Sequence, residues 1–240
     1  MTERSYGKQS AKHRKTLFSA TELAFAAEMK VLLGFAAMSL LIFIPAGDVY
    51  FGGVLLMCVL FIPMLIAGII LLFKNPSLLQ KRLDAKEKDI SQQRVVAMSG
   101  MMFFAGFILC GLDHRFSWLV LPEWVSVIFA VVFLAGYLMY AEVLRENTYL
   151  SRTVRVEKGQ KVIDKGLYGI IRHPMYTATI IMFVSIPLVL GSVIALPVFL
   201  IYPVIIIMRL GNEEKLLCRE LDGYRAYKKK VRYRLIPYIF

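Results

Sequence analysis

Two short polar clusters stand at the ends of a long apolar run, and their residue types are those that bind charged ligands. The first cluster is RHPMY at residues 172–176, and the second is RLGNEE at residues 209–214. Because a proline follows His173, the backbone there is biased away from helix, and Pro174 can begin the next helix. N–H groups at such a helix start favour an anionic ligand. Arg172 and His173 would add side-chain donors.

The second cluster places a cation and an anion on one helical face. Arg209 and Glu213 are four residues apart, so their side chains are neighbours on a helix. Such a pair can bind a ligand that carries both signs of charge. A solvated ion pair at the end of a helix accounts for the same spacing equally well, and the spacing alone leaves both interpretations open.

The apolar run between the clusters predicts how they meet. Residues 177–210 are almost uninterrupted apolar sequence, broken at Gly191-Ser192. At a helical rise of about 1.5 Å per residue, this length supplies two passes of roughly 25 Å each. A hairpin returns its end to the side where it began. We therefore expect the two clusters to face each other at one surface of the membrane.

The composition is that of a membrane protein. Of 240 residues, 58% are hydrophobic and 19% are charged, and several apolar runs approach or exceed the roughly 18–20 residues that cross a bilayer core. We predict an all-α polytopic membrane bundle of about six transmembrane helices, ending in a C-terminal helical hairpin. The predicted spans are 31–44 with a start within 23–29, 50–73, 95–112, 122–140 and the two arms of 177–210, and a surface helix is expected at about 76–93.

The positive charges follow the predicted topology. The chain has a net charge of +12, but its Lys and Arg residues alternate between rich segments and poor connections, and the connections at 45–49 and 190–194 contain none. This alternation is typical of the positive-inside rule, with both termini cytoplasmic, and argues against nucleic-acid binding. We expect three parts: a basic cytoplasmic leader at 1–22, spans one to four at 23–141, and a functional core at 142–240 with the hairpin 177–210 and an interfacial tail.

The remaining polar features predict no metal site. In the loop at 147–168, apolar and polar residues alternate on both sides of Lys158-Gly159. This pattern favours extended backbone and a turn. The cysteines and histidines are too dispersed for a disulfide framework or a metal centre: Cys58, Cys110, Cys218, His13, His114 and His173.

A known family carries the same motifs in the same order. GLYGIIRHPMY at 166–176, Arg209-x-x-x-Glu213-Glu214, and GYxxYxxxVxR from Gly223 together resemble the isoprenylcysteine carboxyl methyltransferase family, in a wider group with phospholipid N-methyltransferases. The resemblance covers roughly residues 142–237. Members commonly have Pro at the position of Leu167 and often Gly at that of Ala178. Neither position supplies a side-chain donor.

The resemblance implies an S-adenosylmethionine-dependent methyltransferase with its cofactor pocket at the cytoplasmic membrane face. It implies that Arg209 faces the methyl acceptor. An ionised acceptor carboxylate needs no general base near pH 7, whereas an amine must lose a proton, for which Glu214 is the nearest candidate. The implied cofactor-binding residues are Gln160, Lys161, Val162, Ile163, Tyr168, His173, Pro174, Met175, Tyr176 and Glu213.

Four functional interpretations remain open from the sequence. We expect O-methylation of a lipidic or prenylated acceptor carboxylate, with phospholipid N-methylation as the alternative. A sterol-reductase-like enzyme using NADPH is a further alternative, although no glycine-rich phosphate-binding motif supports it. A non-enzymatic scaffold or transporter is disfavoured because the spans carry few intramembrane charges. Membrane lipids are the other expected partners.

Overall fold

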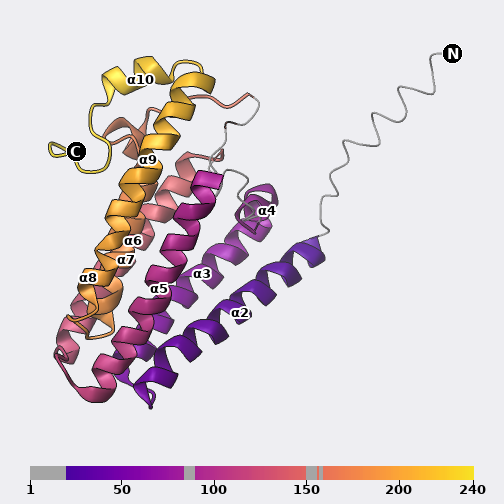
Figure 1. Cartoon of the computed structure of the whole chain (residues 1–240). Coiled ribbons are helices and arrows are strands. Elements are labelled where there is room, and N and C mark those ends of the chain that lie inside the picture. The colour runs from indigo at the N-terminus through magenta and orange to yellow at the C-terminus, as the bar shows by residue number, and fades with distance from the viewer. Residues whose placement is uncertain (1–19, 84–89, 150–155, 157–158) are drawn as a thin grey trace.

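The computed structural model describes residues 20–83, 90–149, 156 and 159–240, and within them the chain is helical (Figure 1). The described residues form no β-strand beyond an isolated bridge between Val120 and Ser192. The predicted all-α fold is confirmed. The elements are α2 (Ala20–Ala46), α3 (Phe51–Lys74), α4 (Pro76–Leu83), α5 (Ile90–Phe116), α6 (Glu123–Glu146), the 3₁₀ turn η1 (Gly166–Gly169), α7 (Pro174–Val189), α8 (Leu196–Phe199), α9 (Ile201–Glu220) and α10 (Tyr224–Lys230).

The long helices have the length and composition of membrane spans. Five candidate spans occur in the described part of the chain: Thr21–Ala46, Phe51–Lys74, Gln93–Phe116, Glu123–Glu146 and Leu196–Glu220. The first arm of the predicted hairpin, α7, is a shorter apolar helix of 16 residues. At about 1.5 Å per residue it rises only about 24 Å. The fifth predicted pass is therefore this short helix rather than a full-length span.

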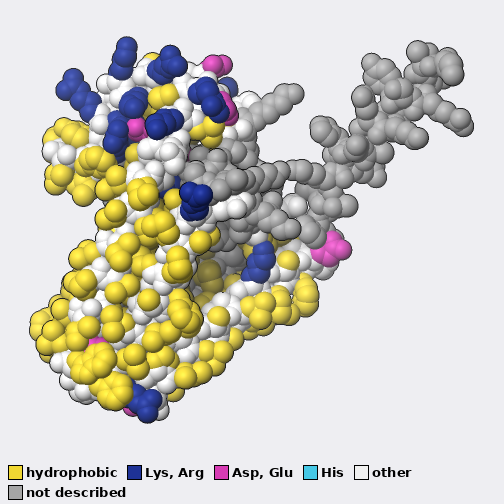
Figure 2. All heavy atoms as spheres, viewed as in Figure 1, with side chains coloured by type: hydrophobic (Ala, Val, Ile, Leu, Met, Phe, Trp, Pro, Cys, Tyr) yellow, Lys and Arg dark blue, Asp and Glu magenta, His cyan; other side chains and the backbone are white. Residues whose placement is uncertain are grey.

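The outer surface of the bundle is apolar, as a lipid-facing surface must be. Figure 2 shows hydrophobic side chains over the long helices, while Lys and Arg gather at the end that carries α10. Large side chains such as Leu33, Ile69, Val131 and Leu138 are more than half exposed. A water-soluble protein rarely exposes so much contiguous apolar surface. The chain is an integral, multi-pass membrane protein.

The predicted hairpin is present, and its turn lies where the sequence placed the break. Helix α7 ends at Val189, Gly191 adopts a positive φ of 78°, and the N–H of Ser192 donates to the carbonyl of Pro187 at 2.8 Å. Helix α9 then returns to the end at which α7 began. Helix α7 packs closely along α6, since a Cβ added at Gly136 would lie 2.8 Å from Met182.

Two predicted boundaries were wrong. The third predicted span ended at residue 112, but α5 continues to Phe116 and Asp113 is fully buried. Its carboxylate accepts the N–H of Leu119 at 2.9 Å and the hydroxyl of Ser192, so the helix end is satisfied inside the protein. The predicted surface helix begins at Pro76 as α4, but residues 90–93 already belong to α5. Residues 84–89 and the leader up to residue 19 lie outside the described residues.

Candidate functional site

A pocket lies at the end of the bundle where the hairpin returns, enclosed by η1, the start of α7, the second half of α9, and α10. Ten sequence-predicted residues line it: Gln160, Lys161, Val162, Ile163, Tyr168, His173, Met175, Tyr176, Arg209 and Glu213. The structure thus brings both motif clusters to one cavity. The predicted residues Pro174 and Glu214 do not line it. Arg172, which the sequence offered as a side-chain donor, also lines the pocket. Seven further lining residues were not predicted: Asn147, Tyr149, Leu216, Leu217, Leu221, Tyr224 and Tyr227.

The two clusters are joined through the hydroxyl group of Tyr176. This hydroxyl donates to a carboxylate oxygen of Glu213 and accepts a hydrogen bond from Nε of Arg209 at 3.1 Å. Tyr176 is 4% exposed. The cation and anion predicted to share one face of α9 are therefore held in place by a side chain from α7, and both line the pocket.

The backbone of the turn before α7 is occupied by the C-terminal segment of the chain. His173 precedes the helix and Pro174 is its first residue, as the sequence predicted. However, the N–H of Arg172 donates to the carbonyl of Tyr233 at 2.9 Å, and that of His173 to the carbonyl of Arg234 at 3.0 Å. These two N–H groups are therefore not available to a ligand, contrary to the expectation for a helix start. Pro174 is buried beneath the turn.

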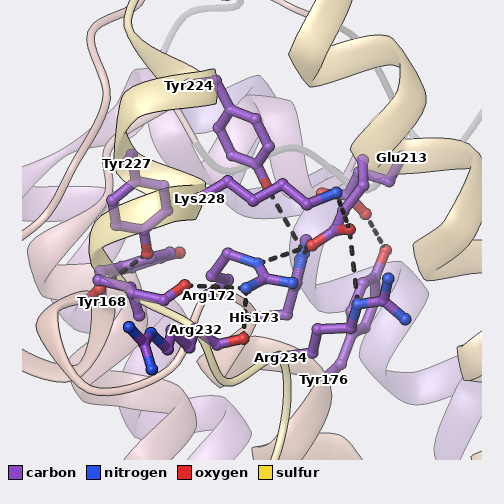
Figure 3. Close-up of polar contacts among 12 residues, drawn as sticks. Tyr168, Arg172, His173, Tyr176, Glu213, Tyr224, Tyr227, Lys228, Arg232 and Arg234 are labelled. Carbon is purple, nitrogen blue, oxygen red and sulfur yellow. Dashed lines mark hydrogen bonds and ion pairs between the residues drawn. The ribbon is translucent and has the colours of Figure 1, made fainter. Parts of the chain in front are cut away.

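Glu214 is the centre of a buried ion-pair cluster. Its partners Arg172, His173, Lys228 and Arg234 converge in Figure 3. One carboxylate oxygen lies 2.7 Å from Nε of Arg172 and 3.4 Å from Nε2 of His173. The other lies 3.1 Å from Nζ of Lys228 and 3.5 Å from Nε of Arg234. Only 4% of the Glu214 side chain is exposed. Four nitrogen-bearing side chains thus surround one carboxylate, which holds α7, α9, α10 and the C-terminal segment together.

Helix α10 covers one side of the pocket with two tyrosines. It starts after Gly223, whose φ of 82° lies in the left-handed region that favours glycine. The hydroxyl of Tyr227 donates to the carbonyl of Tyr168 at 2.7 Å, and that of Tyr224 lies 3.5 Å from Nε2 of His173. Burial raises the pKa of both tyrosines, so both hydroxyls remain protonated.

The end of α6 positions the Gly-Leu-Tyr-Gly motif. The carboxylate of Glu146 accepts the N–H of Leu167 at 3.2 Å. Gly166 has a φ of 54°, and an added Cβ would lie 1.5 Å from the Glu146 carboxylate. The amide of Asn147 donates to the hydroxyl of Tyr168 at 3.0 Å. In the sequence, Glu146 and Asn147 follow a predicted span and precede the motif loop. This position was the signal that could have identified them.

The fold and the site together define a class: a polytopic helical membrane protein with a polar pocket at one end of its bundle. Residues 126–219 match the model of the isoprenylcysteine carboxyl methyltransferase (ICMT) family. The matched segment contains both motif clusters and agrees with the sequence resemblance.

Two further comparisons give partial similarities. A Delta(14)-sterol reductase, TM7SF2, from Mus musculus is 30% identical over 92 residues, which are 37% of this chain and 22% of that protein. The chain therefore matches about a fifth of that relative's length. The solved eukaryotic intramembrane Ras methyltransferase ICMT aligns with 96% of this chain and 90% of its own, at 18% identity and a TM-score of 0.46.

Proposed function

We propose that this protein is a membrane methyltransferase that uses S-adenosylmethionine to methylate a carboxylate on a lipidic acceptor. The observation that carries the proposal is the convergence of the family's two motifs on one pocket, where Tyr176 links Arg209 and Glu213. We further propose that this end of the bundle faces the cytoplasm, because the Lys- and Arg-rich segments lie there.

The residues of the pocket fit the proposed cofactor. When bound, S-adenosylmethionine supplies an electrophilic methyl group on a positively charged sulfur, together with an ammonium group. Among the pocket-lining residues that the structure describes, Glu213 is the one acidic side chain. Its carboxylate suits either positive group, while Tyr168, Tyr224 and Tyr227 offer aromatic surface to an adenine ring or a cation. Residues 160–163 line the same cavity and would contact the cofactor from the loop.

Arg209 is the group on the pocket wall that would orient an acceptor carboxylate. A guanidinium can hold a carboxylate through two parallel hydrogen bonds. Tyr176 fixes Nε of Arg209 and therefore its direction. Methyl transfer requires alignment and exclusion of water more than acid–base catalysis, and an ionised carboxylate is already a nucleophile. The chain's task is then to position two ligands in a dry site.

The environment of Glu214 favours a carboxylate acceptor over an amine. An amine acceptor needs a base, and Glu214 was the candidate. In the structure Glu214 is absent from the pocket wall, and its two oxygens are engaged by Arg172, His173, Lys228 and Arg234. A carboxylate that is paired in this way is a poor proton acceptor. We propose that Glu214 holds the site together and does not take part in proton transfer.

The alternative functions have unequal support. Phospholipid N-methylation would use the same cofactor pocket with another base. An NADPH-dependent reductase is supported by the 30% identity with the sterol reductase segment. A non-enzymatic role does not explain why polar side chains line the pocket.

Calorimetric titration of the detergent-solubilised protein distinguishes these functions. We expect saturable binding of S-adenosylmethionine to the parent, and at least tenfold weaker binding to Glu213→Ala. Glu220→Ala is the matched control, because it removes an exposed carboxylate from the same helix outside the pocket. Saturable binding of NADPH without binding of S-adenosylmethionine would overturn the proposal. Methyl-transfer assays with a prenylated cysteine and with phosphatidylethanolamine would then identify the acceptor.

A further inference from the structure

Residues 231–235 of the C-terminal segment, which we call the strap, are hydrogen-bonded to one edge of the candidate site. Beyond the two backbone hydrogen bonds to Arg172 and His173, Nη1 of Arg172 donates to the carbonyls of Val231 and Arg232 at 2.8 and 2.6 Å. The hydroxyl of Thr177 donates to the carbonyl of Leu235 at 2.7 Å. The strap is therefore part of the folded site and not an independent tail.

Residues 234–240, which overlap the end of the strap, close into a compact loop. The N–H groups of Arg234, Leu235 and Ile236 all donate to the carbonyl of Phe240, at 2.8, 2.8 and 3.1 Å. The guanidinium of Arg234 lies 5.1 Å from the centre of the Phe240 ring. Leu235 is 4% exposed and packs in the main core. These contacts give the loop one defined inner side.

The outer side of this loop exposes apolar residues that no part of the described chain covers. Ile236, Tyr238 and Ile239 are 48%, 88% and 78% exposed. Immediately before them, residues 224–235 contain six Lys and Arg and no acidic residue. In Figure 2 a group of hydrophobic side chains projects beside the cationic end of the molecule, next to the apolar surface of the bundle.

Apolar and aromatic residues next to a cation-rich segment are the composition of a membrane-interface element. The location agrees, because the loop follows α10 at the end of the molecule where the membrane span α9 ends (Figure 1). Lys229 and Arg232 are exposed next to the loop, and Lys side chains can extend their charged ends toward headgroups. Charge complementarity selects anionic lipid as the partner.

We propose that the loop 234–240 docks into the headgroup layer of the leaflet at the pocket end of the bundle. Ile236, Tyr238 and Ile239 enter the boundary with the acyl chains, and Lys229 and Arg232 contact the phosphates of anionic lipids. Because the strap supplies the carbonyls that hold Arg172 and His173, this lipid contact also supports the geometry of the pocket. That last consequence, for cofactor affinity, rests on the proposed function.

Site-directed spin labelling of the full chain in proteoliposomes tests the docking itself. Cys58→Ser and Cys218→Ser remove the accessible thiols, and the fully buried Cys110 can stay. Nitroxide labels are placed at Ile239→Cys and, as the water-exposed reference outside the proposed lipid contact, at Glu220→Cys. In vesicles of phosphatidylcholine with 30% phosphatidylglycerol, we expect the first label to collide mainly with dissolved oxygen. The reference label should collide mainly with a water-soluble nickel chelate.

The anionic contribution is tested by lipid composition. We expect the label at residue 239 to become several-fold more accessible to nickel in pure phosphatidylcholine. The combined Lys229→Gln and Arg232→Gln variant, labelled at residue 239, should show that accessibility in both lipids. A label that is equally water-exposed in both lipids would overturn the docking, and one that is buried in both would overturn the role of anionic lipid. Neither readout involves methyl transfer, so failure here is distinct from failure of the proposed function.

Discussion

The guanidinium of Arg172 and the carboxylate of Glu214 form a buried ion pair that joins the turn before α7 to the end of the hairpin. Nε lies 2.7 Å from Oε1, and each side chain is only 4% exposed. The two residues are 42 positions apart, and the apolar hairpin fills the interval. A pair in such surroundings fixes how the returning helix docks against the pocket, although its net contribution to stability is small when both charges are present.

We predict that Glu214→Ala destabilises the fold more than a surface change does, because it leaves Arg172 charged and unpaired inside the protein. Removing one partner of a buried pair typically costs about 3–5 kcal/mol. Thermal unfolding in detergent measures the loss. Glu220→Ala, an exposed position on the same helix, should change the melting temperature little.

A double-mutant cycle shows whether the loss of stability comes from the interaction between Arg172 and Glu214. We expect Arg172→Met combined with Glu214→Met to be more stable than the sum of the two single changes, by at least about 1 kcal/mol. Additive single effects would show that Arg172 and Glu214 stabilise the fold independently, and the interpretation of Glu214 as an anchor would then be wrong.

The hairpin illustrates what the sequence predicts well. The length of the apolar run and the break at Gly191-Ser192 determine two antiparallel arms, and antiparallel arms bring Tyr176 and Glu213 to one end. Geometry of this kind depends on residue counts and helical rise, which the sequence carries directly. The same reasoning placed Pro174 at the start of α7, because the constraint is local.

The roles of Glu213 and Glu214 illustrate what the sequence does not carry. Adjacent helical residues point about 100° apart. One of the two therefore lines the pocket and the other faces Arg172, but the helix rotation that decides between them is set by packing. Likewise, the N–H groups of the turn are satisfied by carbonyls about 60 residues later. No local pattern marks a partner at that distance.

Tyr176→Phe tests the link between the two clusters. The change retains the ring and removes the hydroxyl that bridges Arg209 and Glu213. Hydrogen bonds to charged groups contribute about 1.5–3 kcal/mol, so we expect kcat/KM for methyl transfer to fall roughly 10- to 100-fold. Tyr137→Phe, on α6 and outside the pocket, is the control. Unchanged kinetics in Tyr176→Phe would show that the bridge has no functional role.

Gly166→Ala tests the placement of the Gly-Leu-Tyr-Gly motif. The position combines a φ of 54° with a Glu146 carboxylate 1.5 Å from where a Cβ would stand. Alanine would displace that carboxylate from the N–H of Leu167 and strain the backbone, at a cost of about 1–3 kcal/mol. We expect a lower melting temperature and weaker cofactor binding. Gly211→Ala should be neutral or slightly stabilising, because nothing lies within 4 Å and the residue is helical.

Tyr227→Phe tests how α10 is held over the pocket. The hydroxyl donates to the carbonyl of Tyr168 at 2.7 Å inside the protein, and its loss leaves that carbonyl without this donor. A penalty of about 1–3 kcal/mol is typical, and we expect faster dissociation of S-adenosylmethionine in stopped-flow measurements. Lys230 lies on the same helix as Tyr227 and forms an exposed ion pair with Asp164. Lys230→Ala removes only this exposed pair and should have little effect.

The pH dependence of this contact follows from the sign of the tyrosine shift. Burial raises the pKa of Tyr227 above its ordinary value near 10. A group whose folded-state pKa is raised contributes its full stabilisation below the unfolded pKa and loses it as pH rises through the folded value. Ionisation of Tyr227 should therefore not change the rate of cofactor dissociation from the parent between about pH 7 and 9. A rate that rises between those values in the parent, but not in Tyr227→Phe, would contradict a buried and protonated Tyr227.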